Sequence, residues 1–545
     1  NCYYIFTTLT FSIMKKILVS AILAGGAISM ASAQSAVDAY TLNPTDLRGT
    51  ARYMSMAGAF TALGGDLSTL TQNPAGIGVY RKSEVGITVD FNMTHSNVST
   101  NVADFKDNNT HVYCNNFGYI GSINLGNNST LRSFNWGASF NRVATFDRTF
   151  HIGEGSGANY VGPSINTSLS NYIASFTTAA PGVLNAYQDN YNPYIDSDAD
   201  WLSILAYNSY IINPSNNDGY NGLWRDGQST GDMGAWVRER GHIDEYNIDF
   251  GGNVLDVVYW GLGFGVTDLT YTQESDYDEK VYNGRVPNSN ATSTVVGDSY
   301  FNLMNNKRVT GTGYNFKVGV IVKPINEVRI GVAIHTPTYY SLSQSFDAST
   351  NFDYSTGYDN MYEDTKPGYF DWRLRSPWRM MFGVAGVIGG RGIISVDYEH
   401  DAYDAMHISD RGIRYNYGPE NKDIKDYFQG SNTIRIGAEY RLTPSFSVRA
   451  GYSYVASSVK SQAENGALEI YTSGTNPAYV FNKDTQYITL GLGYRFKSFY
   501  ADAAYVYKNR KSTYHAFTDY LGVKAPSFDF NDINNNIVLS VGLKF

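Results

Sequence analysis

The sequence has 545 residues, a formal net charge of −9, 45 tyrosines and 53 glycines. The negative charge and the lack of a Lys/Arg-rich block exclude a typical nucleic-acid-binding protein. No segment has 18 consecutive apolar residues after the N-terminal region, which excludes a later transmembrane helix.

The first 33 residues have the features of an export signal. A short basic start at Met14-Lys15-Lys16 is followed by an apolar run over 17–28 and by small residues at Ala31-Ser32-Ala33. This order is typical of a secretory signal peptide, and the run is too short to span a bilayer as a mature helix. We predict that residues 1–33 are the signal peptide, that translation starts at Met14, and that the mature chain begins at Gln34.

Residues 34–82 precede the first regularly alternating segment and are rich in small residues. Asp66 can cap a short helical turn, and Asn73-Pro74 places a second cap before a proline at the first helical position. Two interpretations remain at this point. The segment is either an ordinary irregular N-terminal region or a small plug folded inside the structure that the later residues enclose.

From residue 83 onward apolar and polar residues alternate in runs of about nine or ten residues. The last run, IVLSVGLKF, places Ile537, Leu539, Val541, Leu543 and Phe545 on one face. Such runs have the length that a tilted strand needs to cross a bilayer. The predicted strands are 83–94, 115–126, 131–146, 242–251, 257–274, 307–322, 327–344, 376–389, 392–400, 431–443, 446–457, 485–497, 499–510 and 533–545.

The connections between these segments alternate between short and long. Turns such as 126–128, 323–326 and 443–445 are short, whereas 147–241 and 345–375 are long. A half-buried strand of a soluble sandwich looks the same locally, but a sandwich has no reason for this strict alternation. A membrane barrel has this alternation, because its periplasmic turns are short and its outer loops are long. We therefore predict an all-β fold: a 14-stranded antiparallel transmembrane β-barrel over 83–545 with an N-terminal plug and long extracellular loops.

A resemblance to a known family supports this interpretation. The segment AGAFTALGGDLSTLTQNPAGIGVYRKSEVGI is similar to the N-terminal region of the FadL/TodX family of outer-membrane transporters for long-chain fatty acids and other hydrophobic compounds. The matching plug motif is Gly58, Ala59, Asp66, Asn73, Pro74, Ala75 and Gly76. The resemblance implies a 14-stranded barrel, capture of a hydrophobic ligand by outer loops, and release when the plug shifts or through a gap in the wall. The 147–241 loop is unlike the family, and some family members are labelled hemin receptors, so the ligand stays open.

The long 147–241 loop contains apolar helical stretches that are candidates for ligand capture. The candidate residues are Ile173, Phe176, Trp201, Leu202 and Leu205. Apolar segments in an outer loop form either a small core of the loop itself or a groove for a hydrophobic ligand.

The sequence shows no motif for catalysis, cofactor binding or metal binding. Solvated loop histidines are the favoured interpretation, with heme ligation by His151, His400 or His407 as the alternative. We expect a non-enzymatic importer in the outer membrane of a Gram-negative cell. Its expected partners are membrane lipid, a hydrophobic small molecule and the barrel assembly machinery, which would recognise the last strand ending at Phe545; no nucleic acid is expected. The alternatives are a hemin-binding receptor or adhesin without transport, and an outer-membrane barrel enzyme.

Overall fold

The computed structural model describes residues 34–126, 128–155, 161–179, 184, 191–197, 199–215, 219–288, 293–355, 358–412 and 415–545. The predicted signal peptide over 1–33 lies outside these residues. Within the described chain no helix is long and apolar enough to cross a membrane.

The wall is a closed antiparallel barrel of fourteen strands. Several of these strands are interrupted and carry more than one label. In chain order the wall consists of β1 (Glu84–Ser99), β2 (Asp104–Asn124), β3 (Leu131–Thr145) with β4 (Arg148–Ile152) and β5 (Ser164–Ile165), β8 (Thr230–Val254), β9 (Val258–Pro287), β10 (Thr294–Ile325), β11 (Val328–His335) with β12 (Tyr339–Tyr354), β14 (Gly368–Arg375) with β15 (Arg379–Ile388), β16 (Gly392–Asp401) with β17 (His407–Asp410), β18 (Ser431–Arg441), β19 (Phe446–Val455), β20 (Tyr479–Phe496), β21 (Phe499–His515) and β22 (Ser527–Lys544).

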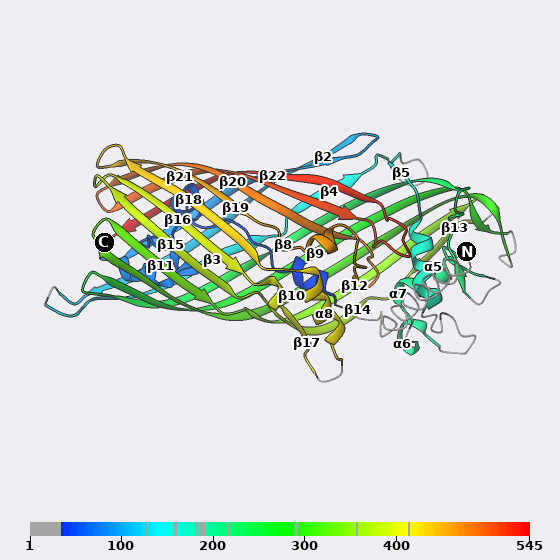
Figure 1. Cartoon of the computed structure of the whole chain (residues 1–545), viewed down its shortest axis with the longest axis horizontal. Helices are drawn as coiled ribbons and strands as arrows, with labels where there is room; N and C mark the ends of the chain where they lie inside the picture. The colour runs from blue at the N-terminus through cyan, green and yellow to red at the C-terminus, as the bar shows by residue number, and fades with distance from the viewer. Residues whose placement is uncertain are drawn as a thin grey trace, which may run out of the picture.

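The ring closes because the first strand pairs with the last. β1 lies between β2 and β22, and its register with β22 runs from Glu84↔Lys544 to Val98↔Phe530. A closed ring leaves no sheet edge facing lipid, which is the condition for strands to span a bilayer. Figure 1 shows the barrel on its side, with the short turns and the C-terminus at one end.

The strand faces point as the alternation predicted. Leu490 on β20 is 55% exposed on the outside, whereas Arg435 on β18 is 7% exposed and faces the interior. The outer face carries a continuous apolar band, and such a band around a closed antiparallel barrel is the surface of an outer-membrane protein. The chain is therefore an outer-membrane β-barrel, with charged side chains turned into its lumen.

Many residues that the sequence assigned to long outer loops are strands. β9 has 30 residues and β10 has 32, so the 275–306 connection is mainly the upper part of one hairpin. β13 (Tyr358–Asp364) adds a further pairing to β12. These strand ends rise above the apolar band, where both faces are wet or packed on other loops. The alternation therefore fades there, and the pattern did not reveal them.

Short helices lie at the outer end and inside the barrel. Among the long-loop residues are α5 (Leu169–Ala179), α6 (Pro193–Asp196) and α7 (Trp201–Asn208), opposite the short turns in Figure 1, with β6 (Asn213–Pro214) pairing β7 (Tyr220–Asn221). The 402–478 loops add η3 (Tyr403–Ala405), α8 (Gly418–Tyr427) and α9 (Ser461–Glu464). The N-terminal segment forms α2 (Ala36–Thr41), α3 (Ala51–Ser55), α4 (Thr69–Gln72) and η1 (Pro74–Val79).

Candidate functional site

The N-terminal segment is folded by local capping around the Asn73-Pro74 turn. Asn73 Oδ1 accepts a hydrogen bond from the Ala75 amide at 3.0 Å, and Pro74 occupies the start of η1. Asn73 Nδ2 donates to the Thr61 carbonyl at 2.6 Å, which ties this turn to the preceding segment. The Asn73 side chain thus caps the turn and Pro74 occupies its first position, as the sequence predicted.

Asp66 holds the middle of the same segment. Its Oδ1 accepts from the Thr50 hydroxyl at 2.7 Å and from the Ser68 amide at 3.0 Å. The Asp66 carbonyl accepts from the Thr69 amide, which starts the predicted turn. Gly64 has φ of +65°, and a side chain there would meet Gly76 Cα at 2.8 Å, so glycine is required at this close approach.

The plug motif residues are all brought together in this small fold. Gly58, Ala59, Asn73, Pro74 and Ala75 are buried, as are Asp66 and Gly76. Gly58 has φ of +75°. We refer to residues 34–80 as the plug segment.

The plug segment touches the wall at a ring of inward-facing glycines. We define the glycine belt as Gly261, Gly331, Gly383, Gly437, Gly451 and Gly491. A Cβ on Gly383 would lie 2.8 Å from Thr61 Cβ, and one on Gly437 would lie 2.6 Å from the Met56 carbonyl oxygen. Real Cβ atoms do not approach other atoms so closely, and the belt therefore leaves no gap between the plug segment and these strands.

Hydrogen bonds from the plug backbone also reach several wall strands. The Thr61 amide donates to Asp397 Oδ2 at 2.7 Å, and the Ala51 amide donates to Ser540 Oγ at 2.7 Å. On β11 Arg329 donates to the Leu63 carbonyl at 2.7 Å. These contacts satisfy irregular backbone that would otherwise be buried without partners.

Two plug arginines enter ion-pair networks of the wall. Arg52 lies 2.9 Å from Glu439, which also pairs with Arg449 at 2.6 Å, and Arg449 continues to Asp502 at 2.6 Å. Arg48 lies 3.3 Å from Asp90. Removing one member of a buried pair leaves the other charge buried without a partner, which lowers the folding stability by about 3–5 kcal/mol. The plug segment is therefore held by shape, backbone bonds and charge together.

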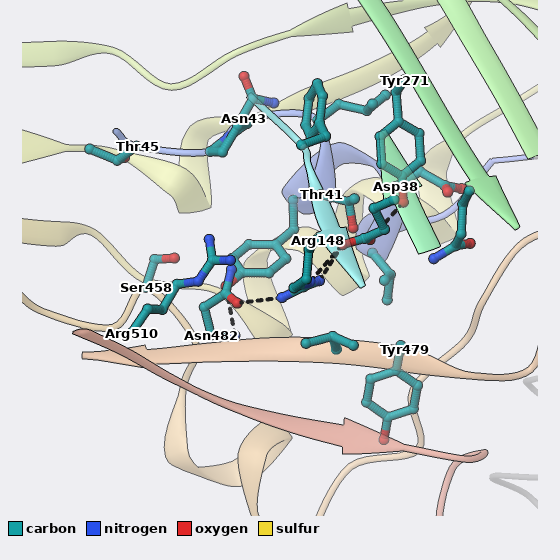
Figure 2. Close-up of a pocket in the computed structure, with 18 of the residues that line it drawn as sticks. Asp38, Thr41, Asn43, Thr45, Arg148, Tyr271, Ser458, Tyr479, Asn482 and Arg510 are labelled. Atoms are coloured by element: carbon teal, nitrogen blue, oxygen red, sulfur yellow. Dashed lines mark hydrogen bonds and ion pairs between the residues drawn. The ribbon is translucent and has the colours of Figure 1, made fainter. Parts of the chain in front are cut away.

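A cavity of about 130 Å³ lies between α2 and the wall, on the outer side of the belt contacts. Its lining is mostly polar, with aromatic rings such as Tyr271 and Tyr479 beside cations that already have acidic partners. Arg148 lies 2.6 Å from Glu239, and Arg510 lies 2.8 Å from Asp532. Figure 2 shows Arg148 bonded to Asn482 across this cavity, at 3.3 Å.

The barrel wall has a seam beside this cavity. Among the described residues β2 pairs with β3 only from Asn116 to Asn124, while residues 104–114 of β2 pair with β1 alone and Asn115 lies at a bulge. On the other side β4 pairs with β8 rather than with β2. We call the interval between residues 104–115 and 142–152 the seam; it starts beside Phe140 and Tyr246, at the upper edge of the apolar band.

Side chains close the seam where backbone hydrogen bonds do not. His151 Nδ1 lies 2.6 Å from Asp107 Oδ2, and its ring packs on Phe105 at 5.4 Å. Closer to the band, Tyr113 donates to Asp147. Asp147 lines the cavity, so the seam and the cavity are neighbours. Side-chain bridges of this kind open at lower cost than a strand ladder.

The predicted capture residues lie mainly in a core of the outer loop. Ile173, Phe176, Leu202 and Leu205 are each at most 8% exposed and belong to one apolar cluster. Trp201 packs on Tyr194 at 5.2 Å and on Phe346 at 5.1 Å between ring centroids. The arrangement favours the loop-core interpretation, and ligand capture by these residues stays a prediction.

The pH is expected to affect this loop through Asp200. Asp200 caps α7 by accepting from the Leu202 amide at 2.8 Å, and burial raises its pKa from 3.8 to about 7 against the opposing backbone hydrogen bonds. Because the folded loop holds this proton more tightly than the unfolded loop, the contribution of Asp200 to the loop's stability is fully present below about pH 4 and is lost as the pH rises through about 7. Wild-type α7 should therefore be cleaved severalfold faster at pH 8 than at pH 5 by a protease active at both. Asp200→Asn keeps the cap and should remove most of this difference, and an unchanged pH dependence in the variant would contradict the assignment.

The candidate heme ligands do not gather at one place. His151 is engaged at the seam, His400 Nδ1 lies 2.9 Å from Asn432 Oδ1, and His407 begins β17. In the described part of the chain no group of three or more His, Cys, Asp or Glu side chains is arranged to hold a metal ion.

Sequence reasoning missed the glycine belt, the plug arginines and the seam. The belt had a visible signal, because Gly437, Gly451 and Gly491 alternate with lipid-facing residues in the predicted strands. Arg48 and Arg52 precede the motif and had no recognisable pattern. The seam depends on which strands pair, and no local pattern reports that.

No protein-family model and no curated protein sequence matches this chain. Solved structures similar to it include the Pseudomonas putida toluene transporter TodX, at 13% identity and a TM-score of 0.49, covering 92% of this chain and 99% of that one. A Pseudomonas aeruginosa FadL homologue has 12% identity and a TM-score of 0.49, covering 92% and 100%. The Ralstonia pickettii toluene transporter TbuX has 11% identity and a TM-score of 0.46, covering 92% and 99%.

Proposed function

We propose that this chain imports hydrophobic molecules, such as long-chain fatty acids, across the outer membrane by diffusion. In this proposal cargo enters between the outer loops and reaches the cavity beside α2. The plug segment blocks straight passage toward the periplasm. The observation that carries the proposal is a lumen occupied by the plug segment beside a seam that side chains bridge.

A lumen occupied by the plug segment favours hydrophobic cargo over polar solutes. The glycine belt leaves no gap beside Thr61 and Met56, whereas a porin for polar solutes has a water-filled channel. A chain of about fifteen methylenes gains on the order of 12 kcal/mol on leaving water. The resemblance of the plug motif to FadL/TodX proteins supports the same cargo class.

The seam is the favoured exit from the cavity. A shift of the plug segment would break the Arg52–Glu439 pair and the Thr61–Asp397 hydrogen bond. Opening the seam breaks two side-chain bridges, Asp107–His151 and Tyr113–Asp147. Release through the plug remains the competing route.

Uptake measurements test the proposal directly. Cells with and without the gene are compared for uptake of labelled long-chain fatty acid and labelled toluene, with hemin binding measured in parallel. Loss of uptake of either compound without the gene is the expected result. Equal uptake together with lost hemin binding would instead indicate a receptor without transport.

A crosslink across the seam separates the two exits. Cysteines at positions 107 and 151, in a Cys114→Ala background, are joined by a short reducible thiol crosslinker. We expect uptake to fall at least about tenfold and to return on reduction, because the seam can no longer widen. The matched control joins cysteines at 97 and 531, which oppose each other in the intact β1–β22 ladder, and should leave uptake unchanged. Full uptake with the 107–151 link in place would refute the seam and favour the plug route.

A further inference from the structure

The cavity beside α2 is lined by five cationic side chains, and each of them is paired with a carboxylate. The pairs are Arg148–Glu239, Lys307–Asp38, Lys483–Asp529, Lys508–Asp46 and Arg510–Asp532. Among the described residues the lining therefore offers a ligand no cation that lacks an acidic partner. A negatively charged ligand would have to compete with a carboxylate that is already in place.

The acidic side chains of the lining make the cavity still less favourable for an anion. Asp38, Asp46 and Glu239 belong to these pairs, whereas Asp147 accepts a hydrogen bond from the Tyr113 hydroxyl. An anionic ligand would lie near these carboxylates without a cation of its own, and a charge moved out of water without a partner is strongly disfavoured. An uncharged ligand meets no such penalty.

The rest of the lining suits a small uncharged molecule. The space of about 130 Å³ is close to that of one aromatic ring, since a cavity of about 150 Å³ holds benzene. The rings of Phe146 and Tyr271, with centroids 4.9 Å apart, supply apolar surface. Thr41 and Ser458 add hydroxyl groups to the same lining. A ring with a neutral polar substituent matches both kinds of surface.

Asp38 controls whether Lys307 is available to a ligand. Its Oδ1 accepts a hydrogen bond from the Lys307 ammonium, and its Oδ2 accepts from the Ser35 amide at 2.8 Å. Lys307 also donates to the Ser473 hydroxyl at 3.3 Å, and both members of the ion pair line the cavity, where Figure 2 shows Asp38. Loss of the Asp38 charge would leave Lys307 at the cavity without the carboxylate that holds it.

We propose, as an extension that rests on the proposed import function, that this cavity accepts uncharged cargo and rejects carboxylates, and that Asp38 sets this specificity by holding Lys307. A carboxylic acid enters the cavity only in its neutral, protonated form. The ligand class is an uncharged molecule of about one ring, or the uncharged end of a longer one.

Binding of two matched ligands to the purified full-length protein tests this specificity. Benzamide and benzoate have nearly the same shape, and only benzoate is charged at neutral pH. We expect benzamide to bind at least about tenfold more tightly than benzoate in ligand-detected NMR titrations. Val309→Phe fills the cavity, so any signal that remains in this variant is assigned to detergent and subtracted. Equal affinity, tighter binding of benzoate, or no binding of benzamide would overturn the proposal.

Asp38→Asn tests the role of the ion pair with Lys307. The asparagine keeps an acceptor for the Ser35 amide but removes the charge that holds Lys307. We expect benzoate to bind at least about fivefold more tightly than to the wild type, with little change for benzamide, because the ammonium can now pair with the ligand. The matched control combines Asp38→Asn with Lys307→Gln and should bind benzoate as weakly as the wild type. An unchanged benzoate affinity in folded Asp38→Asn would contradict the role of Asp38.

Uptake by cells separates this specificity from import itself. If uptake of labelled fatty acid or toluene depends on the gene while benzoate binds like benzamide, only the specificity is wrong. If uptake is the same with and without the gene, the import function fails and the specificity for cargo fails with it.

Discussion

Replacing Gly383 by Val should displace the plug segment and let small ions through the barrel. Gly383 faces inward on β15, where a Cβ would lie 2.8 Å from Thr61 Cβ and 2.5 Å from Asp397 Oδ1. The valine needs space that the plug occupies, and overpacking of this kind costs about 1–3 kcal/mol. It also disturbs the bond from the Thr61 amide to Asp397. We expect the conductance of the purified protein in planar bilayers to rise from near the membrane background to that of an open channel.

Gly386→Val is the matched control for this experiment. Gly386 lies on the same strand, and a Cβ there has no atom within 4 Å. The substitution makes the same change in chemistry and strand propensity without touching the plug. Equal conductance of the two variants, whether low or high, would contradict the view that the glycine belt seats the plug.

Leu490→Arg should prevent most of the protein from assembling in the membrane. Leu490 lies on the outer face of β20 between Ile488 and Leu492, which are 52% and 51% exposed there. An arginine near the midplane of a lipid-facing strand costs about 2–4 kcal/mol. The expected result is a large fall in the folded fraction after refolding into lipid vesicles, read from the mobility shift of unheated samples on gels.

Ser445→Arg provides the control for this charge. Ser445 lies in the short turn between β18 and β19, outside the strands, where the cost of a charge falls to about 0–1 kcal/mol. This variant should refold like the wild type. Normal refolding of Leu490→Arg would mean that β20 is not oriented toward lipid as described.

The inward neighbour of Leu490 shows where sequence reasoning was incomplete. From the sequence, an arginine at Gly491 is expected to be tolerated better than one at Leu490, provided that the lumen has room. The structure leaves no such room, because Gly491 lies against Ser55 of the plug segment, with Ser55 Oγ 2.8 Å from an ideal Cβ. We therefore expect Gly491→Arg to be disruptive as well, through the plug rather than through lipid.

The faces of the membrane strands could be predicted because lipid imposes a strict rule. Ile434 and Ile436 must be apolar on the outside, whereas Arg435 between them is free to be charged. Above the membrane this rule ends, and residues 294–306 of β10 read as a loop although they form a strand. The strand order was accessible through the alternation of short and long connections.

Only those parts of the candidate site that depend on residues close together in the sequence were predictable. The Asn73-Pro74 dipeptide predicts the turn that it forms, since the cap and the proline act within a few residues. The partners of Arg52 and the missing β2–β4 ladder arise from contacts between residues far apart in the chain. No short-range pattern encodes such contacts, and the capture residues show the same limit, because a loop core and a ligand groove use the same apolar residues.

The close fit at the glycine belt sets an order of assembly. A plug that touches Gly331, Gly383 and Gly437 without clearance would meet these strands on entering a ring that has already closed. We therefore expect the N-terminal segment to be in position while the sheet is still open. The pairing of β22 with β1 then becomes the last step, and the strand ending at Phe545 completes the enclosure around a part of the chain that was made first.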